Sequence, residues 1–175
     1  MASRRPDSPF DTLETTFRLG CAGPKPWSID GRCVPGLADR TIPLDELRGM
    51  LLHPSTSYQT RDVALSLLVS AAQTQGGSAT VGLAGVLLFG LRRSVSALCA
   101  ACPKRADDIE AEALAGLVEA IAATEPGRPR LAARLCWLAR NQAKRLFDAE
   151  LEPNVPNQID TPTPPNHGFR GHTPT

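Results

Sequence analysis

The chain has 175 residues, of which 42% are hydrophobic and 21% are charged, and its net charge is +1. This length suits one compact domain with tails, and the near-neutral charge excludes a polycationic nucleic-acid binder, so any affinity for DNA has to come from a local patch. Aromatic residues make up only 5%, and Ala and Leu, which are good helix formers, supply most of the apolar mass. The composition therefore favours helices, and the helical patterns along the chain predict an all-α fold, a compact bundle of about five helices.

Two features bear on where the chain works. Residues 1–10 are polar and lack the apolar stretch of a secretory signal, and the odd number of five cysteines favours a reducing compartment. The longest apolar run, 81–91, is broken by glycines and is shorter than the ~20 residues that a membrane span needs. We therefore expect a cytoplasmic protein with no membrane partner, in which this run forms a core helix.

The first half of the chain divides into two parts. Residues 1–40 are rich in Pro and Gly, which predicts an irregular N-terminal segment that drapes over the core through Trp27 and Val34. Residues 41–78 predict a two-helix part. Its first helix, 43–52, has a proline and two acidic residues in its first turn, where the helix dipole favours them, and its second helix covers 58–74.

The second half predicts a helical domain over 79–152 and a tail. Its three helices are expected at about 79–102, 105–123 and 129–150, and Pro103 ends the first of them because the residue before a proline is pushed out of the helical region. Residues 153–175 are rich in Pro, Thr and Asn and cannot bury an apolar face, which predicts a disordered C-terminal tail.

The predicted 105–123 helix is amphipathic. Its apolar side is expected to hold Ala113, Leu114, Leu117, Val118 and Ile121. On the opposite side Asp108, Glu112 and Glu119 form an acidic stripe, with the small Ala115 between them. Spacing alone favours a solvated face that keeps the protein soluble, and the alternative is a surface that a partner approaches.

The predicted 129–150 helix has a basic face that includes a tryptophan. Its apolar side is expected to bury Leu131, Leu135, Leu138, Ala139 and Leu146. The basic face carries Arg130, Arg134, Trp137, Asn141 and Lys144, with Arg140 and Arg145 at its margins and Arg128 just before it. An exposed Trp among arginines can stack on an unpaired base while the cations hold phosphates. Alternatively, Trp137 packs against the N-terminal segment or another helix, and the sequence leaves both open.

These two helices resemble a known family. The stretch ADDIEAEALAGLVEAI (106–121) followed by RLCWLARNQAKRL (134–146) resembles region 2 of the extracytoplasmic-function sigma factors of the sigma-70 family. The resemblance implies that the first helix binds RNA polymerase, with Asp107, Asp108, Glu112 and Glu119 on or near the contact. It also implies that the second helix and its preceding loop bind promoter DNA through Arg128, Arg130, Arg134, Trp137, Arg140, Asn141, Lys144 and Arg145.

The chain departs from the family at several points. The family's tryptophan position falls on Arg134, and the tryptophan stands at 137 instead. The second helix runs into Asp148, Glu150 and Glu152 where the family has a basic end. The proline-rich residues that follow are not expected to form a helix-turn-helix that reads a −35 element. These departures favour a derived transcription regulator over a promoter-selective sigma factor. The alternative is a helical interaction module that binds another regulatory protein without touching DNA.

Other candidate sites are weak. Cys99 and Cys102 form a C-x-x-C pair, but a structural zinc site usually takes four ligands from two such pairs, and a redox motif would stand at a helix start rather than at a helix end. We therefore expect two buried thiols. The three histidines have no nearby carboxylate or nucleophile in the sequence, and the chain contains no P-loop and no nucleophile elbow. We expect no enzyme activity, no cofactor and no metal.

Overall fold

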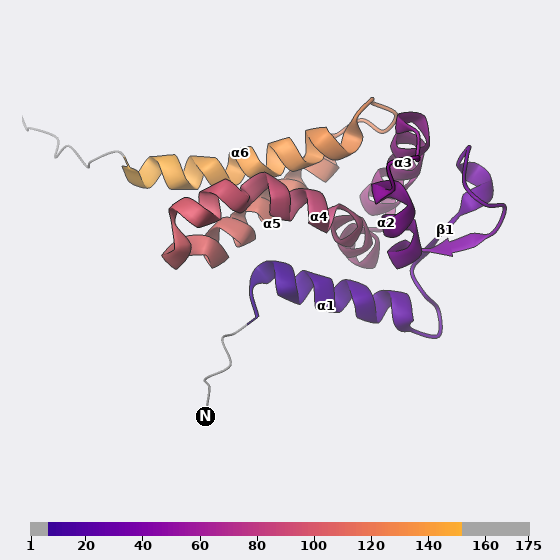
Figure 1. The fold of residues 1–175 in the computed structure, drawn as a ribbon, viewed down its shortest axis with the longest axis horizontal. Coiled ribbons are helices and arrows are strands. Elements are labelled where there is room, and N and C mark those ends of the chain that lie inside the picture. The colour runs from indigo at the N-terminus through magenta and orange to yellow at the C-terminus, as the bar shows by residue number, and fades with distance from the viewer. Residues whose placement is uncertain (1–6, 152–175) are drawn as a thin grey trace, which may run out of the picture.

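A computed structural model describes residues 7–151, and this part of the chain folds into six α-helices and one two-stranded sheet (Figure 1). The helices are α1 (Pro9–Ala22), α2 (Leu44–Leu52), α3 (Tyr58–Gln75), α4 (Gly77–Ala101), α5 (Ala106–Ala123) and α6 (Leu131–Leu151). Short 3-10 turns cover Gly31–Cys33 and Pro103–Arg105. The described residues are mostly helical, as predicted, but they form six helices rather than about five, and the expected helices from residue 43 onward begin and end within two residues of their predicted bounds. The predicted tail, 153–175, lies outside the described residues.

The predicted irregular segment 1–40 is wrong, because it contains α1. Ser8 caps this helix by accepting a hydrogen bond from the Asp11 backbone N–H at 3.3 Å, and Pro9 occupies the first turn. Phe10, Phe17 and Cys21 are buried at helical spacing. The breakers concentrate after Gly23, so the composition of residues 23–40 obscured a helical pattern that precedes them.

The remainder of this segment links α1 to α2. Strands β1 (Ser28–Asp30) and β2 (Thr41–Pro43) pair antiparallel, with Ile29 opposite Ile42. The backbone of Trp27 ties the two helices together, because its N–H donates to the Gly20 carbonyl at 3.0 Å and its carbonyl accepts from the Leu44 N–H at 2.8 Å. The expected packing of Trp27 and Val34 on the core is confirmed.

Helix α4 is the centre of the fold and contacts α1, α2, α3, α5 and α6 (Figure 1). Leu83, Leu88 and Leu91 are fully buried. Gly85 lets α1 approach closely, since a Cβ there would lie 2.0 Å from the Phe17 ring. By length and composition α4 could also cross a membrane, and half of its most apolar stretch is buried inside this fold.

Helices α5 and α6 lie side by side over a long contact, but their buried faces differ from the predicted ones (Figure 1). Gly116 of α5 packs on α6 so closely that a Cβ there would lie 2.5 Å from Gln142 Cβ. Val118 and Leu138 are 52% and 37% exposed, although both were expected to be buried. Cys136 and Ala143 are buried instead, and the Leu146 side chain lies outside what the structure describes.

Candidate nucleic-acid interface

The loop between α5 and α6 is held against α3 by the polar side chains of Gln73 and Ser66. Gln73 Nε2 donates to the carbonyls of Ile121 and Thr124, at 2.8 and 2.7 Å, and so satisfies backbone groups at the end of α5. Ser66 Oγ accepts from the Gly127 N–H at 3.0 Å. These residues lie on one side of α3, so the loop is fixed along its length rather than at its ends alone.

The start of α6 is fixed by a carboxylate from another helix. Both oxygens of Asp62 accept backbone N–H groups, from Arg130 at 2.9 Å and from Leu131 at 3.0 Å. Arg130 has a φ of 57°, a left-handed conformation that non-glycine residues rarely adopt. Asp62 therefore replaces the usual local N-cap and holds Arg130 in this conformation. We call these two hydrogen bonds from the Arg130 and Leu131 N–H groups to Asp62 the clamp. No sequence signal pointed to the clamp, since Asp62 and Arg130 are far apart in the chain.

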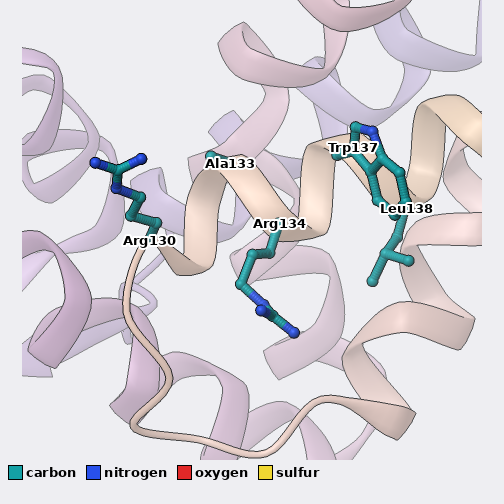
Figure 2. A pocket seen from close by; sticks show the side chains of 5 residues that line it. All are labelled: Arg130, Ala133, Arg134, Trp137 and Leu138. Carbon is teal, nitrogen blue, oxygen red and sulfur yellow. The ribbon is translucent and has the colours of Figure 1, made fainter.

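Trp137 stands in a shallow hollow on the outer face of α6. The hollow has a volume of about 370 Å³ and is lined by Arg130, Ala133, Arg134, Trp137 and Leu138, which follow one another along the helix (Figure 2). The Trp137 side chain is 59% exposed. Among the described residues, those that line hollows together with Trp137 come from α6, from α5 and from Arg130, not from the N-terminal segment, so of the alternative packing partners only another helix, α5, borders it. We call this surface the Trp137 hollow.

A second hollow lies on the other side of Trp137, between α5 and α6. It has a volume of about 260 Å³ and shares Trp137 and Leu138 with the first. Glu119 of α5 lines it together with Asn141 and Arg145 of α6. The predicted acidic and basic surfaces therefore meet at this point, whereas the sequence placed them on separate helix faces.

The other predicted basic residues lie apart from both hollows. Arg128 pairs with Glu125 at 3.3 Å, and Lys144 pairs with Asp148. Both pairs are largely exposed, so their contribution to stability is small and a phosphate could compete for either cation. Arg140 is half-buried. The structure therefore brings together Arg130, Arg134, Trp137, Asn141 and Arg145, and leaves Arg128, Arg140 and Lys144 outside this group.

The predicted acidic stripe follows the outer side of α5. Asp107, Asp108 and Glu119 are exposed and Glu112 is half-buried. Asp108 forms an exposed ion pair with Arg105 at 3.1 Å. Glu110, which the sequence did not single out, has a structural role, because its Oε2 accepts the Phe10 N–H at 3.0 Å and so joins α5 to the start of α1.

The thiols differ in their surroundings. Burial raises the pKa of Cys136 to about 11, so this thiol stays protonated at neutral pH. Burial also raises the pKa of Cys99, which is half-buried like Cys102, although both were expected to be buried. Over residues 7–151 no three His, Cys, Asp or Glu side chains come together as a metal site. In comparisons with known proteins, no family model, curated protein or solved structure matches the chain.

Proposed function

We propose that this chain is a sigma-factor-like transcription regulator that binds single-stranded promoter DNA through α6 and RNA polymerase through α5. The observation that carries the proposal is the exposure of Trp137 in a hollow that two arginines line. A tryptophan that is 59% exposed contributes little apolar burial to the fold, whereas an unpaired base can stack on it. The proposal places the protein in the cytoplasm.

The charges around Trp137 suit a single strand that crosses α6. Arg134 precedes Trp137 by nearly one helical turn and Arg130 by nearly two. Arg145 follows on the far side of the tryptophan, in the second hollow. Cations on both sides of a stacking platform can hold the phosphates on either side of the stacked base.

The polymerase contact rests on α5. Asp107 and Asp108 stand exposed in its first turn, and Glu112 and Glu119 continue the same side of the molecule. An acidic surface of this kind suits a basic partner surface and would speed association by electrostatic attraction. The specific partner comes only from the resemblance to sigma region 2.

A second candidate function is a protein-interaction module that does not bind DNA. The observation in its favour is that Leu138, which lines both hollows beside Trp137, is exposed. Tryptophan, arginine and aliphatic side chains on one surface are also typical of the energetic centre of a protein interface. The two candidates differ in whether the α6 surface binds an oligonucleotide.

Oligonucleotide binding with a matched pair of variants tests the first candidate. Phe89 of α4 is exposed to nearly the same extent as Trp137, at 57%, but does not line either hollow. Stacking of one base contributes about 1–3 kcal/mol, so Trp137→Ala should weaken binding of a labelled single strand by roughly 5- to 150-fold. Phe89→Ala should leave it unchanged, and the affinity should fall steeply with salt.

If Trp137→Ala and Phe89→Ala weaken oligonucleotide binding equally, the stacking proposal is wrong.

A pull-down with RNA polymerase tests the proposed contact between α5 and the polymerase. The charge reversal Asp108→Arg with Glu112→Arg should abolish capture of the polymerase, and the unchanged protein should retain it. Capture that is insensitive to this reversal would refute the role of α5.

A further inference from the structure

A third hollow lies behind α6, on the side turned away from Trp137. Ala132 and Cys136 of α6 line it. Each stands two positions before a residue of the Trp137 hollow, Arg134 or Leu138, and residues two positions apart on a helix point to nearly opposite sides. Ala132 and Cys136 therefore face away from the Trp137 hollow. Its volume is about 120 Å³, and α2, α3 and α4 supply its other walls. We call it the Phe89 groove, after the exposed ring at its edge. Its lining is mostly apolar: Leu51, Leu52, Leu65, Val86, Leu87, Phe89, Gly90, Ala132 and Cys136, with Arg48 and Arg61.

Two large apolar side chains at this groove remain in water. Phe89 is exposed in the middle of α4, and Leu52, the last residue of α2, is 51% exposed. Isolated exposed apolar residues are ordinary, but here an aromatic and an aliphatic side chain from different helices border one apolar depression. Such a surface is typical of a site that another molecule covers.

The two arginines of the groove differ in their partners. Arg48 is neutralised, because Nη1 and Nη2 donate to the two oxygens of Glu14 at 2.9 and 3.0 Å and Nη1 also reaches the Gly85 carbonyl. Arg61 donates from Nη2 to the His53 carbonyl at 2.8 Å, and its guanidinium stacks on the Tyr58 ring at 5.4 Å. Within residues 7–151 Arg61 forms no ion pair.

The Nε of Arg61 is buried without a hydrogen-bond partner, and it is the one such side-chain atom found within residues 7–151. A buried donor that has lost water and gained no acceptor costs free energy. A carboxylate is the acceptor that suits a guanidinium best. The structure therefore combines an apolar groove with a cation that lacks a counter-charge and whose Nε lacks an acceptor.

We propose that the Phe89 groove is a docking site for an acidic amphipathic helix of a partner protein. The apolar side of that helix would cover Phe89 and Leu52, and one of its carboxylates would pair with Arg61 and accept from Nε. The groove runs between helices, where a further helix packs by fitting its side-chain ridges into it. Tyr58, which is 74% exposed and stacks on the Arg61 guanidinium, would be displaced if the carboxylate approaches from its side.

A nucleic acid fits this groove less well than an acidic helix. A phosphate backbone binds several exposed cations in succession. The Phe89 groove offers a single guanidinium that is not already paired, and it is half-buried among apolar side chains. One desolvated cation beside an apolar surface suits one carboxylate on an apolar helix face.

Labelled designed peptides provide the probe. The first is a helix of about 16 residues with Leu and Phe at i, i+3, i+4 and i+7 and Glu on both sides of that stripe. Its twin carries Lys in place of every Glu. Binding to the full chain is measured by fluorescence anisotropy, and circular dichroism shows that each variant is folded.

The Glu peptide should bind and the Lys twin should not. Phe89→Ala should weaken binding of the Glu peptide by about tenfold or more, whereas Trp137→Ala should leave it unchanged. Arg61→Gln should reduce the affinity for the Glu peptide and its dependence on salt, and Leu52→Ser provides a second test of the apolar contact that leaves Arg61 intact.

Three results would overturn the proposal. The first is equal binding of the two peptides, and the second is binding that depends on Trp137 rather than on Phe89. The third is self-association of the chain that Phe89→Ala abolishes, measured by analytical ultracentrifugation, because the occupant would then be a second copy. Failure of oligonucleotide binding at Trp137 would leave these outcomes unaffected, so the two proposals can fail separately.

Discussion

The clamp between α3 and α6 makes a quantitative prediction about stability. Asp62 accepts the N–H groups of Arg130 and Leu131 at 2.9 and 3.0 Å. Loss of an N-cap acceptor costs about 0.5–2 kcal/mol, and the negative charge at the helix start adds about 0.3–1 kcal/mol. The site is partly exposed, so water can replace some of the lost bonds. We expect Asp62→Ala to lower the free energy of unfolding by about 2 kcal/mol.

Urea unfolding followed by circular dichroism measures this loss, and hydrogen exchange at the start of α6 localises it. Asp62→Asn is the matched control, because the amide keeps one acceptor oxygen but loses the charge, and it should cost about half as much. Thermal unfolding should shift by roughly 4–8 °C for the alanine variant. A loss below about 0.5 kcal/mol for Asp62→Ala, or equal losses for Ala and Asn, would refute the clamp as described.

Three further predictions concern other parts of the fold. Gly116→Ala should destabilise the protein by about 1–3 kcal/mol because the added Cβ meets Gln142. Gly49→Ala in α2 is the control and should not destabilise the protein, because a Cβ there meets nothing within 4 Å. Equal urea midpoints for the two variants would contradict this prediction. Hydrogen bonding to Arg48 lowers the pKa of Glu14, so the free energy of unfolding should fall as the pH drops below about 4.5. Glu14→Gln should make the free energy of unfolding, measured over this acid range, depend less on pH. A thiol reagent at pH 8 should label Cys33, which is exposed, well before the buried Cys136, and equal rates would contradict the buried position.

The helices that the sequence predicted well are those with local signals. Pro43 and the acidic residues after it mark the start of α2, and Gly76 and Gly77 separate α3 from α4. Helix α1 has comparable signals in Ser8 and in the spacing of Phe10 and Phe17, but the glycines and prolines that follow it dominate the composition of residues 1–40. The strands β1 and β2 have three residues each, too few to show an alternating pattern, and their pairing joins positions that only the folded chain brings together.

The candidate site was predictable only where one helix determines it. The position of Trp137 beside Arg134 follows from the helical period alone. The exposure of Leu138 and Val118 depends on how α5 and α6 pack on their neighbours, which a helical wheel does not contain. The clamp depends on Asp62, which lies 68 positions from Arg130, and no local pattern relates the two residues.

The clamp also decides which part of the α5–α6 segment can bind DNA under the proposed function. The resemblance to sigma region 2 implies a role for the loop that precedes the second helix, yet here Gln73, Ser66 and Asp62 already occupy backbone groups of that loop. Backbone groups bonded to α3 are not free to capture a base, and displacing them would cost the bonds that start α6. The contact with a single strand therefore falls to the side chains of α6 itself. The bonds to Asp62 fix the backbone at Arg130, at the edge of the Trp137 hollow, so under the proposed function less conformational entropy is lost there on binding.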